Sequence, residues 1–245
     1  AAFVQGVLPM VEPQSRTDRV TRVVRTNLGE LKWIEHAASD YTPLQQRGRR
    51  VYIREGCWYC HSQYVRPVTG ETRRSGPVTQ AGEYAYDIPH LFSTRRIGPD
   101  LSRVGLKYSD AWHLAHFWNP RMLSPDSIMP RFTALFEGPY RALVVDDPQG
   151  GRTLQRTPET ERLFDFASTR RLALTPNAEG LLFVPERGRN PLILTPNDEY
   201  AGESVQLITA SEDLRALVAY LQKLGTNRGK WRDRFEPQRM EASQT

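Results

Sequence analysis

The stretch Cys57-Trp58-Tyr59-Cys60-His61 contains the only two cysteines of this 245-residue chain. Two thiols three residues apart, followed at once by a histidine, is the spacing that attaches a c-type haem: each sulfur bonds to one vinyl group and the histidine ligates the iron. The alternatives are a surface disulfide, a zinc half-site and a thioredoxin-like redox pair. Zinc usually needs four protein ligands, and a redox pair needs no following histidine and normally opens a helix after a strand. This CWYCH motif therefore predicts one covalent haem c, attached through Cys57 and Cys60, with His61 as an iron ligand.

Two helices are predicted on either side of the motif along the chain. Thr42-Pro43-Leu44-Gln45 offers a hydroxyl N-cap, a proline at the first helical position and a glutamine at the third, which predicts a helix that runs to about Glu55. A closing helix is predicted over residues 211–225, where Tyr220 could meet Gly48 of the first helix at a crossing. Its apolar face consists of Leu214, Leu217, Val218, Leu221 and Leu224.

Residues 62–99 are rich in proline, glycine, arginine and tyrosine and have no clear periodicity, which predicts a loop wrapped over the haem. Guanidinium groups match carboxylates in geometry. Among the arginines of this loop, Arg96 and Arg66 are the predicted partners of the haem propionates, and the others are expected in solvent.

The segment Gly98-Pro99-Asp100-Leu101 is predicted to support the iron-bound histidine. A proline carbonyl can accept the proton of the second ring nitrogen, which fixes the orientation of the ring and raises its basicity. We expect Pro99 to do this for His61, and Leu101 to pack on the haem face. An ordinary turn is the alternative, since Gly-Pro-Asp is a common turn sequence.

Met129 is the predicted second axial ligand, because it lies between prolines on an irregular segment that follows a short helix starting at Ser109-Asp110. Met122 is the competing methionine, but its place beside Arg121 at a helix exit favours packing. The remaining histidines could also ligate the iron in principle, although such rings are usually hydrogen-bonded or exposed: His36, His90, His113 and His116.

Charge and hydropathy suggest a surface beside a membrane and no nucleic-acid partner. Lys and Arg number 33 against 28 Asp and Glu, a net charge of +5 without a basic stripe. No stretch reaches the roughly 20 apolar residues of a membrane span. Residues 1–11 are mostly apolar and are expected to be the last turns of a membrane anchor, or else a segment docked on the core. Residues 15–31 carry valines and leucines at helical spacing, which predicts an amphipathic helix on a partner or membrane surface; a core helix is the alternative.

The block 137–206 differs from the rest of the chain. Short apolar runs alternate there with Gly, Pro, Asn and Asp, which is typical of strands and turns. We expect a small β-rich excursion that docks on a neighbouring subunit, with a passive loop cover as the alternative.

The order of these elements resembles the class I cytochromes c. More narrowly, the chain is similar to the mono-haem cytochrome c subunit (subunit II) of cbb3-type cytochrome c oxidases. It departs from that pattern at Ile88-Pro89-His90, where the family has His-Pro-Phe, and in the block 137–206. The similarity rests on strings that together cover about residues 41–132: Tyr41-Thr42-Pro43-Leu44, Val51-Tyr52-Ile53-Arg54-Glu55-Gly56-Cys57, His61-Ser62-Gln63, Arg66-Pro67, Gly98-Pro99-Asp100-Leu101, Arg103-Val104-Gly105, Lys107-Tyr108-Ser109-Asp110, Trp112-His113 and Asn119-Pro120-Arg121.

The resemblance implies a mainly α fold, in which a class I cytochrome c domain carries a β-rich insertion and a truncated N-terminal membrane anchor. The expected organisation is the end of the anchor at 1–14, a juxtamembrane amphipathic segment at 15–41, the first part of the cytochrome c domain at 42–136, the insertion at 137–206, the closing helix at 207–228 and a basic tail at 229–245.

The resemblance also implies electron transfer without catalysis in this chain. One haem c with His61 and Met129 as axial ligands would take electrons from a soluble cytochrome c or copper protein and pass them to the catalytic haem-copper subunit, among other respiratory subunits. The complex would lie in the bacterial inner membrane with this haem domain on the periplasmic side. The alternatives are the cytochrome subunit of a nitric oxide reductase, a free diffusible cytochrome c, and a sensor that releases Met129 to bind a gas.

Overall fold

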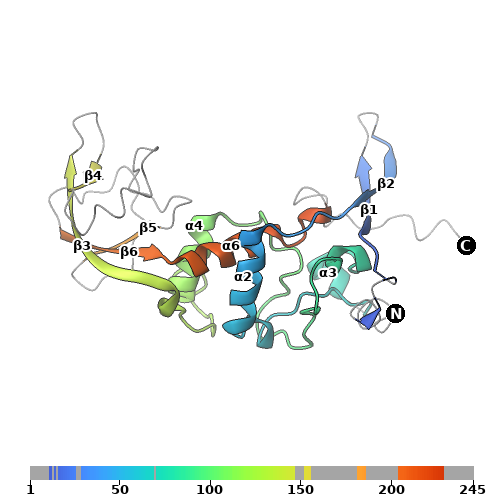
Figure 1. The fold of residues 1–245 in the computed structure, drawn as a ribbon, viewed down its shortest axis with the longest axis horizontal. Helices are drawn as coiled ribbons and strands as arrows, with labels where there is room; N and C mark the ends of the chain where they lie inside the picture. The colour runs from blue at the N-terminus through green and yellow to red at the C-terminus, as the bar shows by residue number, and fades with distance from the viewer. Residues whose placement is uncertain are drawn as a thin grey trace, which may run out of the picture. The chain divides into compact units, whose positions relative to one another are not determined.

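The computed structural model describes residues 11–12, 14, 16–25, 29–68, 70–146, 152–155, 181–185 and 204–228 (Figure 1). The chain divides into two compact units, of which the first comprises Ala1–Lys107 with Ala219–Thr245 and the second comprises Tyr108–Val218. The CWYCH motif belongs to the first unit and Met129 to the second.

The predicted anchor at 1–14 and the basic tail at 229–245 lie almost entirely outside the described residues. Among the helices that the structure describes, none has the length and apolar character to cross a membrane.

A β-hairpin occupies the segment where the sequence predicted an amphipathic helix, so that prediction is wrong. Strand β1 (Arg19–Arg25) pairs antiparallel with β2 (Leu31–Ala37), and Gly29 in the turn has φ of +82°. The valines of β1 fit a helical period and a strand period alike, and their β-branched side chains favour the strand. Val20 is fully buried.

The hairpin docks on the short 3-10 helix η4 (Ala81–Tyr84). The Gln80 side chain accepts a hydrogen bond from Thr21 N (2.8 Å) and donates one to Thr21 O (2.7 Å), as a neighbouring strand would. A Cβ on Gly82 would lie 2.0 Å from Arg19 O, so only glycine allows this approach. The hairpin is thereby fixed on the loop that follows the motif.

Helix α2 (Pro43–Arg54) begins as predicted. The Thr42 hydroxyl accepts a hydrogen bond from Gln45 N (3.3 Å), and the Gln45 side chain accepts one from Thr42 N (2.9 Å), which completes a capping box. Gly56, with φ of +71°, turns the chain directly into the 3-10 helix η3 (Cys57–Tyr59). The cap thus fixes where the helix starts and the glycine fixes where the motif begins.

Helix α6 (Glu212–Lys223) contributes its last turns to the first unit and crosses α2 in Figure 1. The ring of Tyr220, fully buried, packs on Tyr52 with centroids 5.5 Å apart and on Tyr41 at 5.6 Å. Tyr52 lies one helical turn after the buried Gly48, so the crossing is centred close to the predicted point. The Tyr220 hydroxyl donates to Gln63 Oε1 (3.1 Å) and so connects the helix to the segment after the motif.

A buried ionic cluster fixes the chain that follows α6. Glu83 accepts from Arg103 Nη2 (3.0 Å) and lies 3.5 Å from Arg228 Nη1 of η7 (Thr226–Arg228), and all three side chains are at most 5% exposed. Gly105 N donates to Leu224 O (2.9 Å) beside this cluster. Burial lowers the pKa of Arg228, and the Glu83 carboxylate opposes that shift. The Glu83 carboxylate therefore holds η7, and it pairs with Arg103 at the same time.

The second unit combines helix α4 (Asp110–Trp118), the 3-10 helices η5 (Pro120–Met122) and η6 (Thr133–Leu135), and a four-stranded sheet. Ser109 caps α4 by accepting from Trp112 N (3.2 Å). All pairings in the sheet are antiparallel, in the order β4 (Arg152–Leu154), β3 (Phe136–Asp146), β6 (Ser204–Ala210) and β5 (Leu181–Pro185).

These strands fall largely in the block 137–206, where the sequence predicted strands, and much of that block lies outside the described residues. Helices together with small sheets are consistent with the predicted class I cytochrome c fold, which stays a prediction.

Candidate functional site

The two cysteines lie in one tight turn at the end of α2. Cys57 O accepts hydrogen bonds from Cys60 N (3.1 Å) and His61 N (3.0 Å), so the chain folds back immediately. Both thiols are free and half-buried. Burial raises the pKa of the Cys57 thiol to about 12, and the Glu55 carboxylate adds to the shift. A redox pair needs a lowered thiol pKa, so this environment argues against the redox alternative.

His61 is oriented by the Pro99 carbonyl. Its Nδ1 lies 2.8 Å from Pro99 O, and because a carbonyl only accepts, Nδ1 carries the proton. In the neutral ring Nε2 then carries no proton and has a lone pair available. Burial lowers the pKa of His61, although the Pro99 contact and Asp100 oppose this, so the ring is neutral near pH 7. This is the tautomer that an iron ligand requires.

Gly98 supports the ring of His61 from one side. A Cβ at this position would lie 2.2 Å from Cε1 and 2.8 Å from Nε2 of His61, so only glycine leaves room. Gly98 N donates to Cys60 O (3.0 Å), and Leu101 N donates to Ser62 O (2.8 Å). Leu101 is half-buried.

These residues fit a c-type haem. Two free thiols at the attachment spacing precede a neutral histidine whose Nδ1 is engaged and whose ring lies in a cradle that admits no side chain. In the part of the chain that the structure describes, no three His, Cys, Asp or Glu side chains form a metal-binding group, so a zinc site has no support there.

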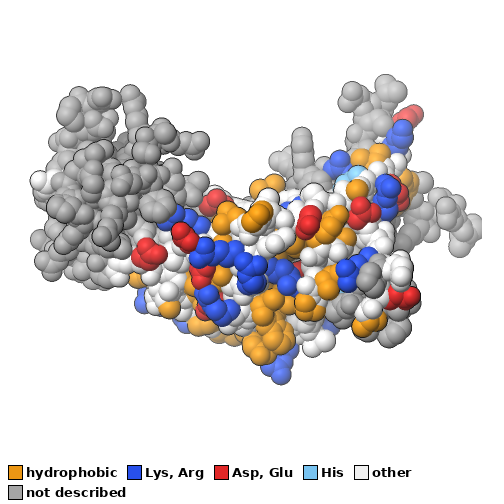
Figure 2. Space-filling view, viewed as in Figure 1, with side chains coloured by type: hydrophobic (Ala, Val, Ile, Leu, Met, Phe, Trp, Pro, Cys, Tyr) orange, Lys and Arg blue, Asp and Glu red, His pale blue; other side chains and the backbone are white. Residues whose placement is uncertain are grey.

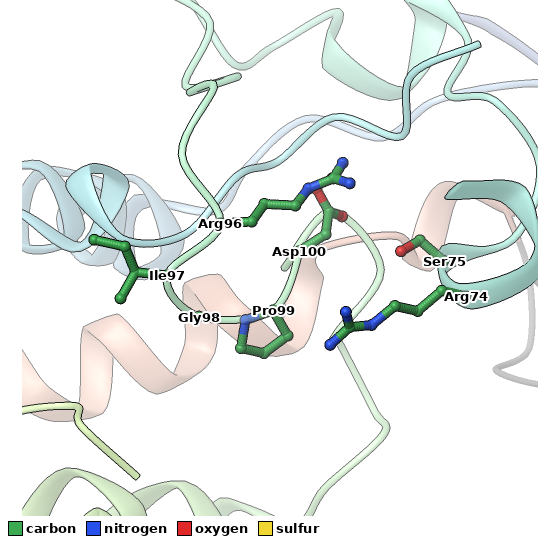
Figure 3. Close-up of a pocket in the computed structure, with 7 residues that line it drawn as sticks. All are labelled: Arg74, Ser75, Arg96, Ile97, Gly98, Pro99 and Asp100. Carbon is green, nitrogen blue, oxygen red and sulfur yellow. The ribbon is translucent and has the colours of Figure 1, made fainter. Parts of the chain in front are cut away.

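Asp100 binds both chain segments beside His61. Its Oδ2 accepts from Ser62 Oγ (2.6 Å) and Tyr64 N (2.9 Å), and its Oδ1 accepts from Ser102 N (2.9 Å) and from the Ser102 hydroxyl. Arg96 Nη2 lies 3.5 Å from Oδ2. In Figure 3 the side chains of Arg96 and Asp100 point toward one another.

Arg66 and Arg96, the predicted propionate partners, both bind the Glu71 carboxylate at the start of the short helix α3 (Glu71–Ser75). Arg66 Nε lies 2.6 Å and Arg96 Nη1 lies 2.7 Å from Glu71 Oε1. Burial alone would raise the pKa of Glu71, but the hydrogen bonds from Arg96 and Arg66 outweigh it and lower the pKa. A role toward the propionates stays a prediction. Sequence reasoning missed Glu71 and Asp100 as the partners, although a carboxylate five residues after Arg66 was a usable signal.

The surface around the site is partly apolar. Tyr59 is 54% and Ile97 is 56% exposed. Figure 2 shows hydrophobic side chains gathered beyond the C-terminal end of α2, and basic side chains interspersed with acidic ones elsewhere on this face. Beside the segment 96–100 lies a cavity of about 150 Å³ (Figure 3). It is lined by Arg74, Ser75, Arg96, Ile97, Gly98, Pro99 and Asp100.

In the second unit, Met129 lies half-buried on the irregular segment between η5 and η6. Its backbone N donates to Ser127 Oγ (3.3 Å), and Ser127 N donates to Ser124 O (2.9 Å), so the segment forms a compact turn. Met122 is part of η5. Iron ligation by Met129 stays a prediction.

The other histidines have protein surroundings of their own. In the first unit, His36 contacts the Asn227 carbonyl and His90 Nδ1 lies 2.8 Å from Asp87 O. In the second unit, His116 stacks on Trp112 (4.7 Å), and His113 is 3% exposed. Burial lowers the pKa of His113 to about 4, so this ring is neutral.

Comparison with known proteins gives one family. Residues 30–228 match the family described as cytochrome C oxidase, mono-heme subunit/FixO. Comparison with curated proteins finds no match. The matched range includes the CWYCH motif, the segment 98–101, Met129 and the block 137–206. Because it covers most of the sequence, the chain belongs to the family of mono-haem cytochrome c oxidase subunits.

Proposed function

We propose that the chain carries one haem c, attached through thioether bonds to Cys57 and Cys60 and ligated by His61 and Met129. It passes electrons to the catalytic haem-copper subunit of a cbb3-type terminal oxidase. The mono-haem family supports a single haem and membership of an oxidase complex. The observation that carries the attachment is the 2.8 Å contact between His61 Nδ1 and Pro99 O, directly after two free thiols.

The protein residues fix the orientation of His61. Bound haem supplies a one-electron carrier, and a histidine with a methionine gives a higher potential than two histidines. Pro99 holds the proton on Nδ1 and so keeps Nε2 available for the iron. Gly98 has no side chain, so it leaves room for the ring of His61. With two axial ligands no position stays open for a substrate, so oxygen reduction and proton pumping belong to the catalytic subunit.

The proposed location is the bacterial inner membrane, with this domain on the periplasmic side and a soluble cytochrome c or copper protein as donor. The resemblance of residues 41–132 to the cbb3-type subunit supports this placement. The exposed Tyr59 and Ile97 are consistent with a donor surface next to the motif.

Attachment is tested on the denatured protein. When the chain is produced in cells that assemble c-type cytochromes, we expect the denatured polypeptide to retain porphyrin absorbance and to have the mass of one added haem. Cys57→Ala should leave one thioether bond, and the double variant with Cys60→Ala should leave none. Wild-type polypeptide without covalent porphyrin would refute the proposal.

Electron transfer is tested in the purified native complex. We expect the haem of this subunit to be reduced before the catalytic haems after mixing with a reduced periplasmic donor. Oxygen turnover that greatly exceeds nitric oxide turnover would support the oxidase. The reverse ratio would support the nitric oxide reductase alternative instead.

A further inference from the structure

Residues 60–64 and residues 98–102 run side by side at His61. Gly98 N donates to Cys60 O (3.0 Å), and Leu101 N donates to Ser62 O (2.8 Å). The contact between His61 Nδ1 and Pro99 O (2.8 Å) lies between these two bonds along the chain. The position of the carbonyl relative to the ring therefore depends on the register between residues 60–64 and 98–102.

Asp100 is the side chain that fixes this register. Its carboxylate accepts hydrogen bonds from the hydroxyl of Ser62 and the backbone of Tyr64, on the histidine side, and from the backbone and hydroxyl of Ser102 on its own side. The Asp100 side chain is 3% exposed, so water does not replace these donors. The Asp100 carboxylate thus connects Ser62, which follows His61, to the segment that contains Pro99.

Arg96 compensates the charge of the buried Asp100 carboxylate, and an uncompensated buried charge would be strongly destabilising. Its Nη2 lies 3.5 Å from Asp100 Oδ2, and the same guanidinium donates to Ser62 Oγ (2.6 Å) and Tyr64 O (2.6 Å). Glu71 balances Arg96 from the other side at 2.7 Å. Asp100 and Arg96 are therefore both bonded to Ser62 and Tyr64, in the segment that follows the motif.

We infer that Asp100 is a positioning residue for the iron ligand: it holds the Pro99 carbonyl on His61 Nδ1 and thereby sets the basicity of the ring and the haem potential. This inference rests on the proposed function. A hydrogen bond at Nδ1 makes a metal-bound histidine a stronger donor. A stronger donor favours ferric over ferrous iron, so weakening the bond raises the midpoint potential.

The test uses the holoprotein and three variants. Ser62→Ala removes one bond to Asp100 and one from Arg96 without changing charge, and Asp100→Asn removes the charge at nearly constant shape. Asp87→Asn is the matched control, because Asp87 is also a buried carboxylate (2% exposed) paired with an arginine, Arg49, in the same unit. The readouts are the exchange rate of the His61 Nδ1 proton, by NMR of the reduced protein, and the midpoint potential.

We expect Nδ1 proton exchange to be about tenfold faster in Asp100→Asn and in Ser62→Ala, as loss of one hydrogen bond predicts, with a raised potential in both. Asp87→Asn should match the wild type in both readouts. A raised potential in Asp100→Asn with wild-type exchange in both variants would overturn the inference, since the charge alone would then act. Failure of the proposed function is distinguishable, because the wild-type protein itself would then carry no covalent haem.

Discussion

Substitution of Gly98 by alanine tests the geometry of the proximal site with a single added methyl group. The new Cβ would lie 2.2 Å from Cε1, 2.7 Å from Nδ1 and 2.8 Å from Nε2 of His61, against 3.4 Å or more in ordinary contact. The backbone φ of Gly98 is not in the left-handed region. The perturbation is therefore steric, and it acts on the ring rather than on the backbone conformation.

The cost follows from what has to move. Restoring ordinary contact requires a displacement of about 1.2 Å between the ring and the 98–99 backbone. A displacement of that size breaks the 2.8 Å bond to Pro99 or the 3.0 Å bond from Gly98 N to Cys60 O. Overpacking costs about 1–3 kcal/mol and a lost hydrogen bond about 0.5–1.5 kcal/mol. Gly98→Ala should thus lower the free energy of unfolding by about 2–4 kcal/mol.

Urea unfolding of the holoprotein, followed by the main haem absorption band, measures this change, and the spectrum of the folded variant reports altered iron ligation. Ile97→Ala is the neighbouring control: its side chain is 56% exposed, so its effect should stay within about 1 kcal/mol. Equal unfolding free energies for Gly98→Ala and Ile97→Ala, with unchanged haem spectra, would refute the steric reasoning.

Three further predictions concern the second ligand, acid stability and the buried charges. Met129→Ala should lower the midpoint potential and abolish the sulfur-to-iron band of the oxidised haem, whereas Met122→Ala should leave both; the reverse pattern would move the ligand to Met122. Burial lowers the pKa of His113 to about 4 from 6.5, so the unfolded chain binds its proton first as the pH falls. Stability should fall between about pH 6.5 and 4 by about 3 kcal/mol, and His113→Gln should remove that slope in urea titrations. Glu83→Gln leaves two guanidiniums uncompensated and should cost about 3–5 kcal/mol in unfolding free energy; a loss below about 1 kcal/mol would show that the cluster contributes little.

Local rules account for what the sequence predicted well. The capping box at Thr42 depends only on residues three positions apart, and the start of α2 follows from it. The contact between His61 and Pro99 was expected because the motif and the Gly-Pro-Asp-Leu segment each have a known place in such a domain. In both cases a short pattern restricts the geometry.

The features that the sequence did not predict have a common physical origin in long-range contacts. Residues 19–25 form a strand because β2 pairs with them and Gln80 completes their hydrogen bonding, and neither partner is visible in the local period. Arg66 and Arg96 were assigned to propionates from guanidinium chemistry alone. That chemistry is met in the structure by Glu71 and Asp100, whose proximity depends on the folding of the loop.

The four residues after Cys60 show why this site needs long-range support. His61 contacts Pro99, Ser62 and Tyr64 bind Asp100, and Gln63 accepts from the Tyr220 hydroxyl. A 3-10 turn followed by irregular chain has few hydrogen bonds of its own, so these distant partners fix the position of the histidine. Electrostatic stabilisation by protein groups acts without reorganisation cost only when the groups are already in place. Under the proposed function, a histidine held in this way would keep its position in both oxidation states of the iron, which is the property that fast electron transfer demands.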